Sequence, residues 1–129
     1  MYTVTVRDHI MISHSFNDEY FGKASQLHGA TYIVDVSFSS PVLSKYNTVI
    51  DIGYASEVLK KVLEPLRYRN LDDMDDFKGI LTTTEYMAAY IHHKVQEAIL
   101  PAFQGKIKVT LGESHMAWAS YESDEVRNK

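Results

Sequence analysis

The chain has 129 residues, which is enough for one domain with a buried core and too few for two. Its net charge of -4, without a cluster of lysine or arginine, argues against a nucleic-acid-binding protein. The absence of cysteine excludes disulfides and thiolate metal sites, no apolar run approaches the roughly 20 residues of a membrane helix, and residues 1–4 lack the start of a secretion signal. We therefore expect a cytoplasmic protein.

The first third of the chain predicts two long strands. Residues 2–14 alternate between apolar and polar side chains, which predicts a strand with one buried face, and His14 ends it on the buried side. After a loop at 15–27, residues 28–39 alternate in the same way, and His28 shares the parity of the apolar residues. Each histidine therefore lies where a loop meets a strand, an arrangement that can hold imidazoles over a pocket.

The middle of the chain predicts two helices. Apolar residues recur at three- and four-residue spacing from Ala55 to Leu66, which predicts an amphipathic helix that ends near Pro65. A polar loop follows at 67–81.

The second helix is predicted to begin in Thr82-Thr83-Thr84-Glu85, because Thr82 and Glu85 have the spacing of a capping box. Its apolar stripe contains Met87, Tyr90, Ile91, Val95 and Ala98, and we expect His92 and His93 to face solvent.

The last part of the chain predicts two further strands, at 106–113 and 117–122, followed by a C-terminal tail at 123–129. The predicted order is strand, strand, helix, helix, strand, strand. This order indicates an α+β fold in one domain, residues 1–122, with a four-stranded antiparallel sheet and two helices on one face.

Five short motifs accompany this order of elements: Ser13-His14-Ser15-Phe16, His28-Gly29-Ala30-Thr31-Tyr32, Val49-Ile50-Asp51, Thr83-Thr84-Glu85 and Glu113-Ser114. Together they resemble the 6-pyruvoyl-tetrahydropterin synthases and the related 6-carboxytetrahydropterin synthases, and the resemblance runs from about His9 to Tyr121. It implies the T-fold, whose subunits associate edge to edge into barrels, typically a hexamer of two trimeric rings with active sites between subunits. Such a homo-oligomer would cover the unpaired edges of an open sheet.

The resemblance also implies a zinc site. The family binds zinc through three histidines, and His14 and His28 match two of them, while Ala30 stands at the third position. A replacement ligand is to be sought among His115, His9 and Glu113. We predict His115, because it follows Glu113 at the pocket end of the third strand, whereas the parity of His9 points its side chain away from His14. The predicted metal ligands are therefore His14, His28 and His115.

The same resemblance implies a substrate site. Thr83, Thr84 and Glu85 match the start of the family's second helix near the pterin, and Glu113 matches the carboxylate that holds the amino-pyrimidine edge. Helix capping alone accounts for Glu85, so the resemblance adds little at this position.

Two catalytic positions of the family differ in this chain. Ala24 stands where the family has its nucleophilic cysteine, and Arg67-Tyr68 stands where it has an Asp-His pair. Three interpretations of this pair stay open. Tyr68 could act as a general acid, Arg67 could bind a carboxylate or phosphate, or both could be ordinary loop residues.

Two functions follow from this comparison of motifs. The first is a metal-dependent, lyase-type enzyme that acts on a pterin or related heterocycle by an altered mechanism, with negligible conversion of dihydroneopterin triphosphate by the cysteine route. The second is a non-catalytic module that binds a pterin or purine, or serves assembly, on the same scaffold. Either function has a small-molecule heterocycle as its ligand and involves no membrane.

Overall fold

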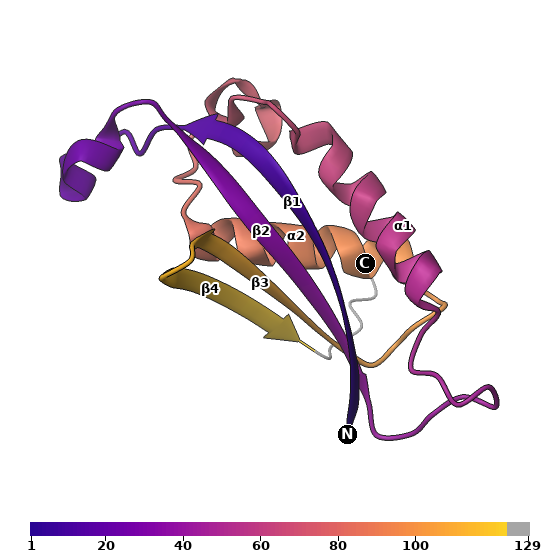
Figure 1. Ribbon diagram of the computed structural model, residues 1–129. Coiled ribbons are helices and arrows are strands. Elements are labelled where there is room, and N and C mark those ends of the chain that lie inside the picture. Colours follow the sequence, from indigo (N-terminus) through magenta and orange to yellow (C-terminus); the bar gives the residue numbers. More distant parts are fainter. Residues whose placement is uncertain (124–129) are drawn as a thin grey trace.

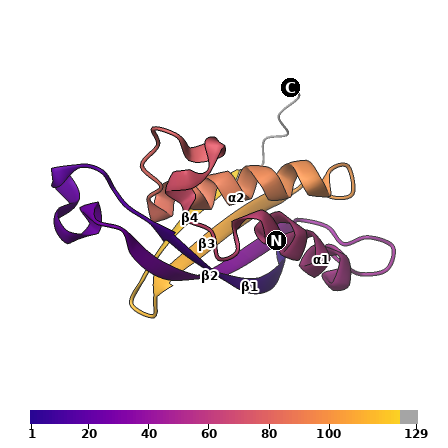
Figure 2. The ribbon, with the colours of Figure 1, turned by 90° about the horizontal axis from the view of Figure 1, so that it is seen from above.

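The computed structural model describes residues 1–123, which form a four-stranded antiparallel sheet with two α-helices on one face (Figures 1 and 2). The strands are adjacent in chain order and the helices stand between the second and third: β1 (Tyr2–His14), β2 (His28–Ser40), α1 (Ile52–Leu63), α2 (Thr84–Ile99), β3 (Lys106–Ser114) and β4 (Ala117–Ser123). The predicted α+β order is confirmed. The sheet is open in one protomer, with β1 and β4 at its edges, so a barrel requires several copies. Of the predicted tail, Ser123 ends β4 and 124–129 lie outside the described residues.

The core lies between the sheet and the helices, because β1, β2 and β3 bury alternate side chains there and β4 half-buries Ala119 and Tyr121. In this layer α1 packs against β1, and α2 packs against β3 and β4. The largest fully buried side chains come from both layers: Tyr32, Phe38, Ile10, Leu59, Leu63, Leu66, Leu71, Met87, Ile91, Ile99, Ile107 and Leu111. The other face of the sheet carries mostly polar side chains. None of the helices in residues 1–123 is long and apolar enough to cross a membrane.

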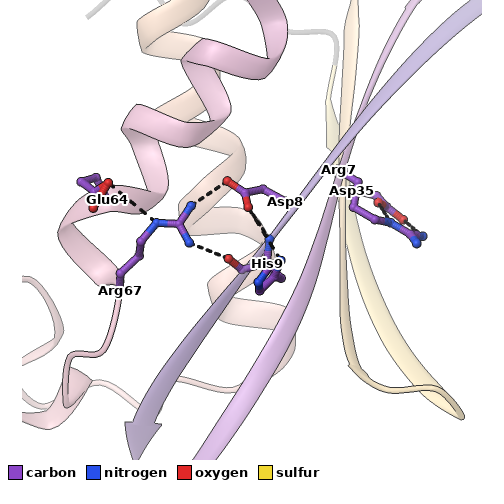
Figure 3. Close-up of polar contacts among 6 residues, drawn as sticks. All are labelled: Arg7, Asp8, His9, Asp35, Glu64 and Arg67. Atoms are coloured by element: carbon purple, nitrogen blue, oxygen red, sulfur yellow. Dashed lines mark hydrogen bonds and ion pairs between the residues drawn. The ribbon is translucent and has the colours of Figure 1, made fainter.

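A segment after α1 covers part of the free edge of β1. The backbone N–H of Tyr68 donates to the carbonyl of Met11 at 2.7 Å, and the N–H of Ser13 donates to the carbonyl of Arg69 at 3.0 Å. The Arg67 guanidinium donates to the carbonyl of His9 at 2.7 Å and to the Asp8 carboxylate at 2.6 Å (Figure 3). The C-terminal half of β1 is therefore paired along its outer edge.

The start of α2 differs from the predicted capping box. The N-cap is Thr83, whose hydroxyl accepts a hydrogen bond from the backbone N–H of Tyr86 at 3.1 Å. Thr82 lies one residue earlier and is buried, and Glu85 becomes the second helical residue, so it cannot return the bond that a capping box needs. The predicted pairing of Thr82 with Glu85 is wrong.

The expectation that His92 faces solvent is also wrong. Its side chain is fully buried, and its ring centroid lies 4.8 Å from that of Tyr121 on β4. The cause is the position of α2 over both β3 and β4, which buries a wider helical face than the apolar stripe predicts.

Candidate functional site

The two histidines of the strand ends lie against each other. His14 and His28 are directly opposite in the pairing of β1 with β2, and opposite residues of an antiparallel pair project to the same face. Their ring centroids are 4.7 Å apart. Phe16 contacts both rings, with centroids 4.7 Å from His14 and 5.7 Å from His28. The structure thus brings together the pair that the alternation places on one face.

Hydrogen bonds fix both imidazoles through their Nδ1 atoms. The Nδ1–H of His28 donates to the carbonyl of Gln26 at 2.8 Å, so in the neutral imidazole Nε2 carries the lone pair. The Nδ1 of His14 lies 3.0 Å from the hydroxyl of buried Thr82. Burial, followed by the neighbouring His28, lowers the pKa of His14 to about 4, so this imidazole is neutral at pH 7. A neutral imidazole can accept a proton or donate a lone pair to a metal.

Within residues 1–123, one protomer brings together two of the donors that a catalytic zinc ion requires. Ala30 has no lone pair, and His115 lies in the turn after β3, where it lines a hollow on the opposite face with Trp118. His9 is exposed and pairs with Asp8 at 3.9 Å. No group of three or more His, Cys, Asp or Glu side chains in residues 1–123 is arranged to hold a metal ion. Catalytic zinc usually keeps three protein ligands, so these residues do not fit a complete zinc centre.

Glu113 lies at the end of β3, where the strand pairing is irregular. Gly112 pairs with Trp118 and Ser114 pairs with Ala117, so Glu113 is the extra residue of a bulge. Bulges re-aim side chains and are frequent beside active sites. The hydroxyl of Thr84, the first residue of α2, lies 3.5 Å from the Glu113 carboxylate. No lysine or arginine of residues 1–123 forms an ion pair with Glu113, which leaves this exposed carboxylate open to a ligand.

The other two predicted substrate residues lie beside this contact. Thr83 is occupied as the N-cap of α2, and Glu85 is exposed on the first turn. The structure therefore brings Thr84 closest to Glu113, with Thr83 and Glu85 as its neighbours along the chain.

Tyr32 connects the histidine pair with Glu113, and sequence reasoning missed it. Its side chain is 1% exposed, its ring centroid lies 6.4 Å from that of His14, and its hydroxyl hydrogen-bonds to the Thr84 side chain. Burial raises the pKa of Tyr32 to about 12; the hydrogen bond with Thr84 opposes this shift and the charge of Glu113 adds to it. The signal was available, because Tyr32 lies four residues after His28 on the same face of β2.

Three other predicted positions have distinct surroundings. Arg67 is engaged by Asp8 and by a backbone carbonyl, so it holds its loop on β1 and is not free for a phosphate. Tyr68 is 81% exposed at the same edge and has a φ of 58°, a conformation that a bulky residue rarely adopts. Ala24 lies in a 3-10 helix (Glu19–Ser25), and its carbonyl accepts a hydrogen bond from the N–H of Phe16 at 3.0 Å.

These residues form one line of contacts, in which His28, His14 and Tyr32 meet through their rings and Tyr32, Thr84 and Glu113 through polar groups. A carboxylate that accepts two N–H groups recognises a planar amino-pyrimidine or amidine edge. Neutral Tyr32 hydrogen-bonds to Thr84, and His14 at the other end of the line is buried and neutral. The exposed Glu113 carboxylate suits such an edge of a planar nitrogen heterocycle.

Comparisons with known proteins point to one family. The family model described as 6-pyruvoyl tetrahydropterin synthase matches residues 3–124. The 6-pyruvoyl tetrahydrobiopterin synthase of Dictyostelium discoideum is 35% identical over 77 residues, which cover 58% of this chain and 57% of that protein. The Homo sapiens protein of the same name is 28% identical over 102 residues, 76% of this chain and 70% of the relative.

Solved structures show the same fold. The Caenorhabditis elegans 6-pyruvoyl tetrahydropterin synthase superposes with a TM-score of 0.82 over 95% of both chains, at 24% identity. A catalytic-residue mutant of the Plasmodium vivax enzyme superposes with a TM-score of 0.80 over 95% of this chain and 97% of that one, at 19% identity. The predicted T-fold is thereby confirmed for residues 1–123.

Proposed function

This chain belongs to the 6-pyruvoyl tetrahydropterin synthase family, and on that premise we propose that it binds a pterin or a closely related heterocycle. The single observation that carries the proposal is Glu113. This carboxylate is exposed at a bulge, has no cationic partner in residues 1–123, and lies 3.5 Å from the hydroxyl of Thr84. Glu113 would accept the two N–H groups of the amino-pyrimidine edge, and Thr83, Thr84 and Glu85 would form the adjoining wall.

The proposed activity is that of a lyase-type enzyme with an altered mechanism. Because Ala24 cannot act as a nucleophile or base, the cysteine route of the family is closed, and losing one such group typically costs about 10²–10⁴ in rate. In this chain Tyr32 would fix Thr84 beside the bound heterocycle. The alternative is a module that binds the heterocycle without turnover.

The zinc proposal requires a donor from outside the described part of one protomer. His14 and His28 would supply two imidazoles, and the third ligand would come from the bound heterocycle or a second copy, since His115 lies on the opposite face. Zinc, when bound, would polarise oxygens of the ligand's side chain. A homo-oligomeric barrel, such as a hexamer, and a cytoplasmic location complete the proposal.

The binding proposal is tested by titrating the protein with neopterin and following the pterin fluorescence. We expect Glu113→Gln to weaken binding by about ten- to a hundredfold, because a hydrogen bond to a charged group contributes about 1.5–3 kcal/mol. The matched control is Glu97→Gln, an exposed position on α2, which we expect to leave binding unchanged. Equal binding by wild type and Glu113→Gln would overturn the proposal.

Catalysis and metal binding are tested on the same preparation. Elemental analysis and a zinc titration of wild type and His28→Ala measure the ion, and product analysis with dihydroneopterin triphosphate and other reduced pterins measures turnover. Metal at about one per chain with turnover supports the enzyme. A metal-free protein that binds neopterin supports the module, and rapid elimination of the triphosphate would contradict the altered mechanism.

A further inference from the structure

The face of the sheet that the helices leave uncovered contains a hollow. Its volume is about 580 Å³, and it spans all four strands from Arg7 on β1 to Trp118 on β4. Small-molecule pockets usually measure about 300–1,000 Å³. Figure 3 shows Arg7 and Asp35, which line this hollow, on the side of the sheet away from Asp8 and Arg67. The hollow is therefore separate from the line of residues between His28 and Glu113.

A missing side chain creates the centre of the hollow. Ile33, Gly112 and Trp118 are consecutive partners across β2, β3 and β4, so the glycine lies between two apolar side chains. A Cβ at Gly112 would meet the Cβ of Ile33 at 3.6 Å, an ordinary contact, so the space is open rather than closed by a neighbour. Ile33 is 39% exposed and Trp118 66% exposed, which leaves a flat apolar slot with an aromatic wall.

Polar rows run along both sides of this slot. Arg7, Asp35 and Thr110 are paired across β1, β2 and β3, and Thr31 and Ser114 lie on the other side. Two residues along a strand correspond to about 6.5–7 Å, the scale of a fused ring. Each row lies two residues from Ile33 along β2, so a bicyclic ring over the slot reaches one row with one edge.

The ion pair in the first row determines the charge of a suitable ligand. The Nε and Nη2 of Arg7 donate to the two carboxylate oxygens of Asp35 at 2.7 and 2.9 Å, which leaves Nη1–H donors and further carboxylate lone pairs side by side. Because the two charges compensate each other, this row favours a ligand whose edge is neutral and has one donor and one acceptor. A strongly charged ligand group fits it less well.

We propose that this hollow binds a neutral, planar heteroaromatic molecule of purine size. Its ring lies against Trp118 and Ile33 across Gly112, where an aromatic face gains more than area burial alone. Its N–H and C=O edge faces the row formed by Arg7, Asp35 and Thr110. This site does not depend on the proposed pterin site, because the two lie on opposite faces of the sheet.

Trp118 is the only tryptophan of the chain, so its fluorescence reports directly on the hollow. Hypoxanthine is titrated as the probe, and caffeine, whose ring nitrogens carry methyl groups in place of N–H donors, is the comparison. We expect saturable quenching by hypoxanthine and binding of caffeine that is weaker by about tenfold or more, because the polar row loses its partner.

Two variants that introduce the same residue, glutamate, distinguish binding in the hollow from binding elsewhere on this face of the sheet. Ile33→Glu places a charge in the slot and removes saturable quenching, whereas Ser37→Glu lies on the same face of β2 outside the hollow and keeps it. Asp35→Asn preserves the shape of the row and weakens the binding of hypoxanthine severalfold. This second variant keeps the test valid if Ile33→Glu fails to fold.

The pterin site is distinguished by Glu113→Gln, which leaves quenching by hypoxanthine unchanged. The proposal is overturned by unsaturable quenching of the wild type, by equal binding of hypoxanthine to wild type and to folded Ile33→Glu, or by quenching that depends on Glu113.

Discussion

Acid is expected to destabilise this protein through His14. The side chain is 2% exposed, and burial lowers its pKa to about 4, whereas an imidazole in an unfolded chain has a pKa of about 6.5. Between these values the unfolded state binds the proton more strongly, so stability is full above about pH 6.5 and falls as the pH drops. The two pKa values give a loss of about 2 kcal/mol at pH 5 and of about 3 kcal/mol once the pH is below 4.

Urea denaturation at about pH 8 and pH 5 measures this loss, with a chelator present and at one protein concentration because assembly shifts apparent stability. We expect the drop between the two pH values to shrink by about 2 kcal/mol in His14→Gln, whose amide can still meet Thr82. His9→Asn is the matched control, since His9 is exposed, and we expect it to keep the full drop. An unchanged drop in His14→Gln would refute the reasoning.

Three further predictions concern packing and hydrogen bonds. Arg67→Leu removes a guanidinium that is 23% exposed and also donates to the carbonyl of His9, and it costs about 1–3 kcal/mol; Arg7→Leu removes one that is 69% exposed and costs less than about 1 kcal/mol. Equal losses in urea would contradict this. Thr83→Ala removes the N-cap of α2 and lowers stability by about 1 kcal/mol, and an unshifted thermal transition would argue against the cap. Gly105→Ala forces a Cβ against a backbone carbonyl of β2 and lowers the free energy of unfolding by about 1–3 kcal/mol. Gly112→Ala changes the free energy of unfolding by less than about 0.5 kcal/mol. A larger loss for Gly112→Ala than for Gly105→Ala in urea would contradict this prediction.

The strands could be predicted because their side chains alternate over many residues. Residues 2–14 were predicted as one strand and form Tyr2–His14, and the second prediction, 28–39, differs from His28–Ser40 by one residue. The 3-10 helix Glu19–Ser25 was missed, because its seven residues show no apolar period and contain Gly22 with a φ of 57°. The alternation of apolar and polar residues therefore predicts the long strands, but it does not predict the short 3-10 helix in the loop.

The site was predictable only where strand parity determines position. Parity alone places His14 and His28 on one face, and the pairing of β1 with β2 puts them opposite each other. Thr82 reaches His14 from 68 residues away, a contact that requires the packed position of α2. His115 follows a bulge and a turn, so its parity with Glu113 says nothing about which face it occupies.

Because side chains of β2 alternate between the two faces of the sheet, neighbouring residues of this strand belong to different surfaces. Tyr32 serves the helix side of the sheet, and Thr31 and Ile33 line the hollow on the other side. Substitutions at every second residue of β2 can thus change one face of the sheet and leave the other face unchanged. A single inserted residue upstream would exchange the two surfaces at once, so we expect β2 to tolerate replacement far better than a change in length.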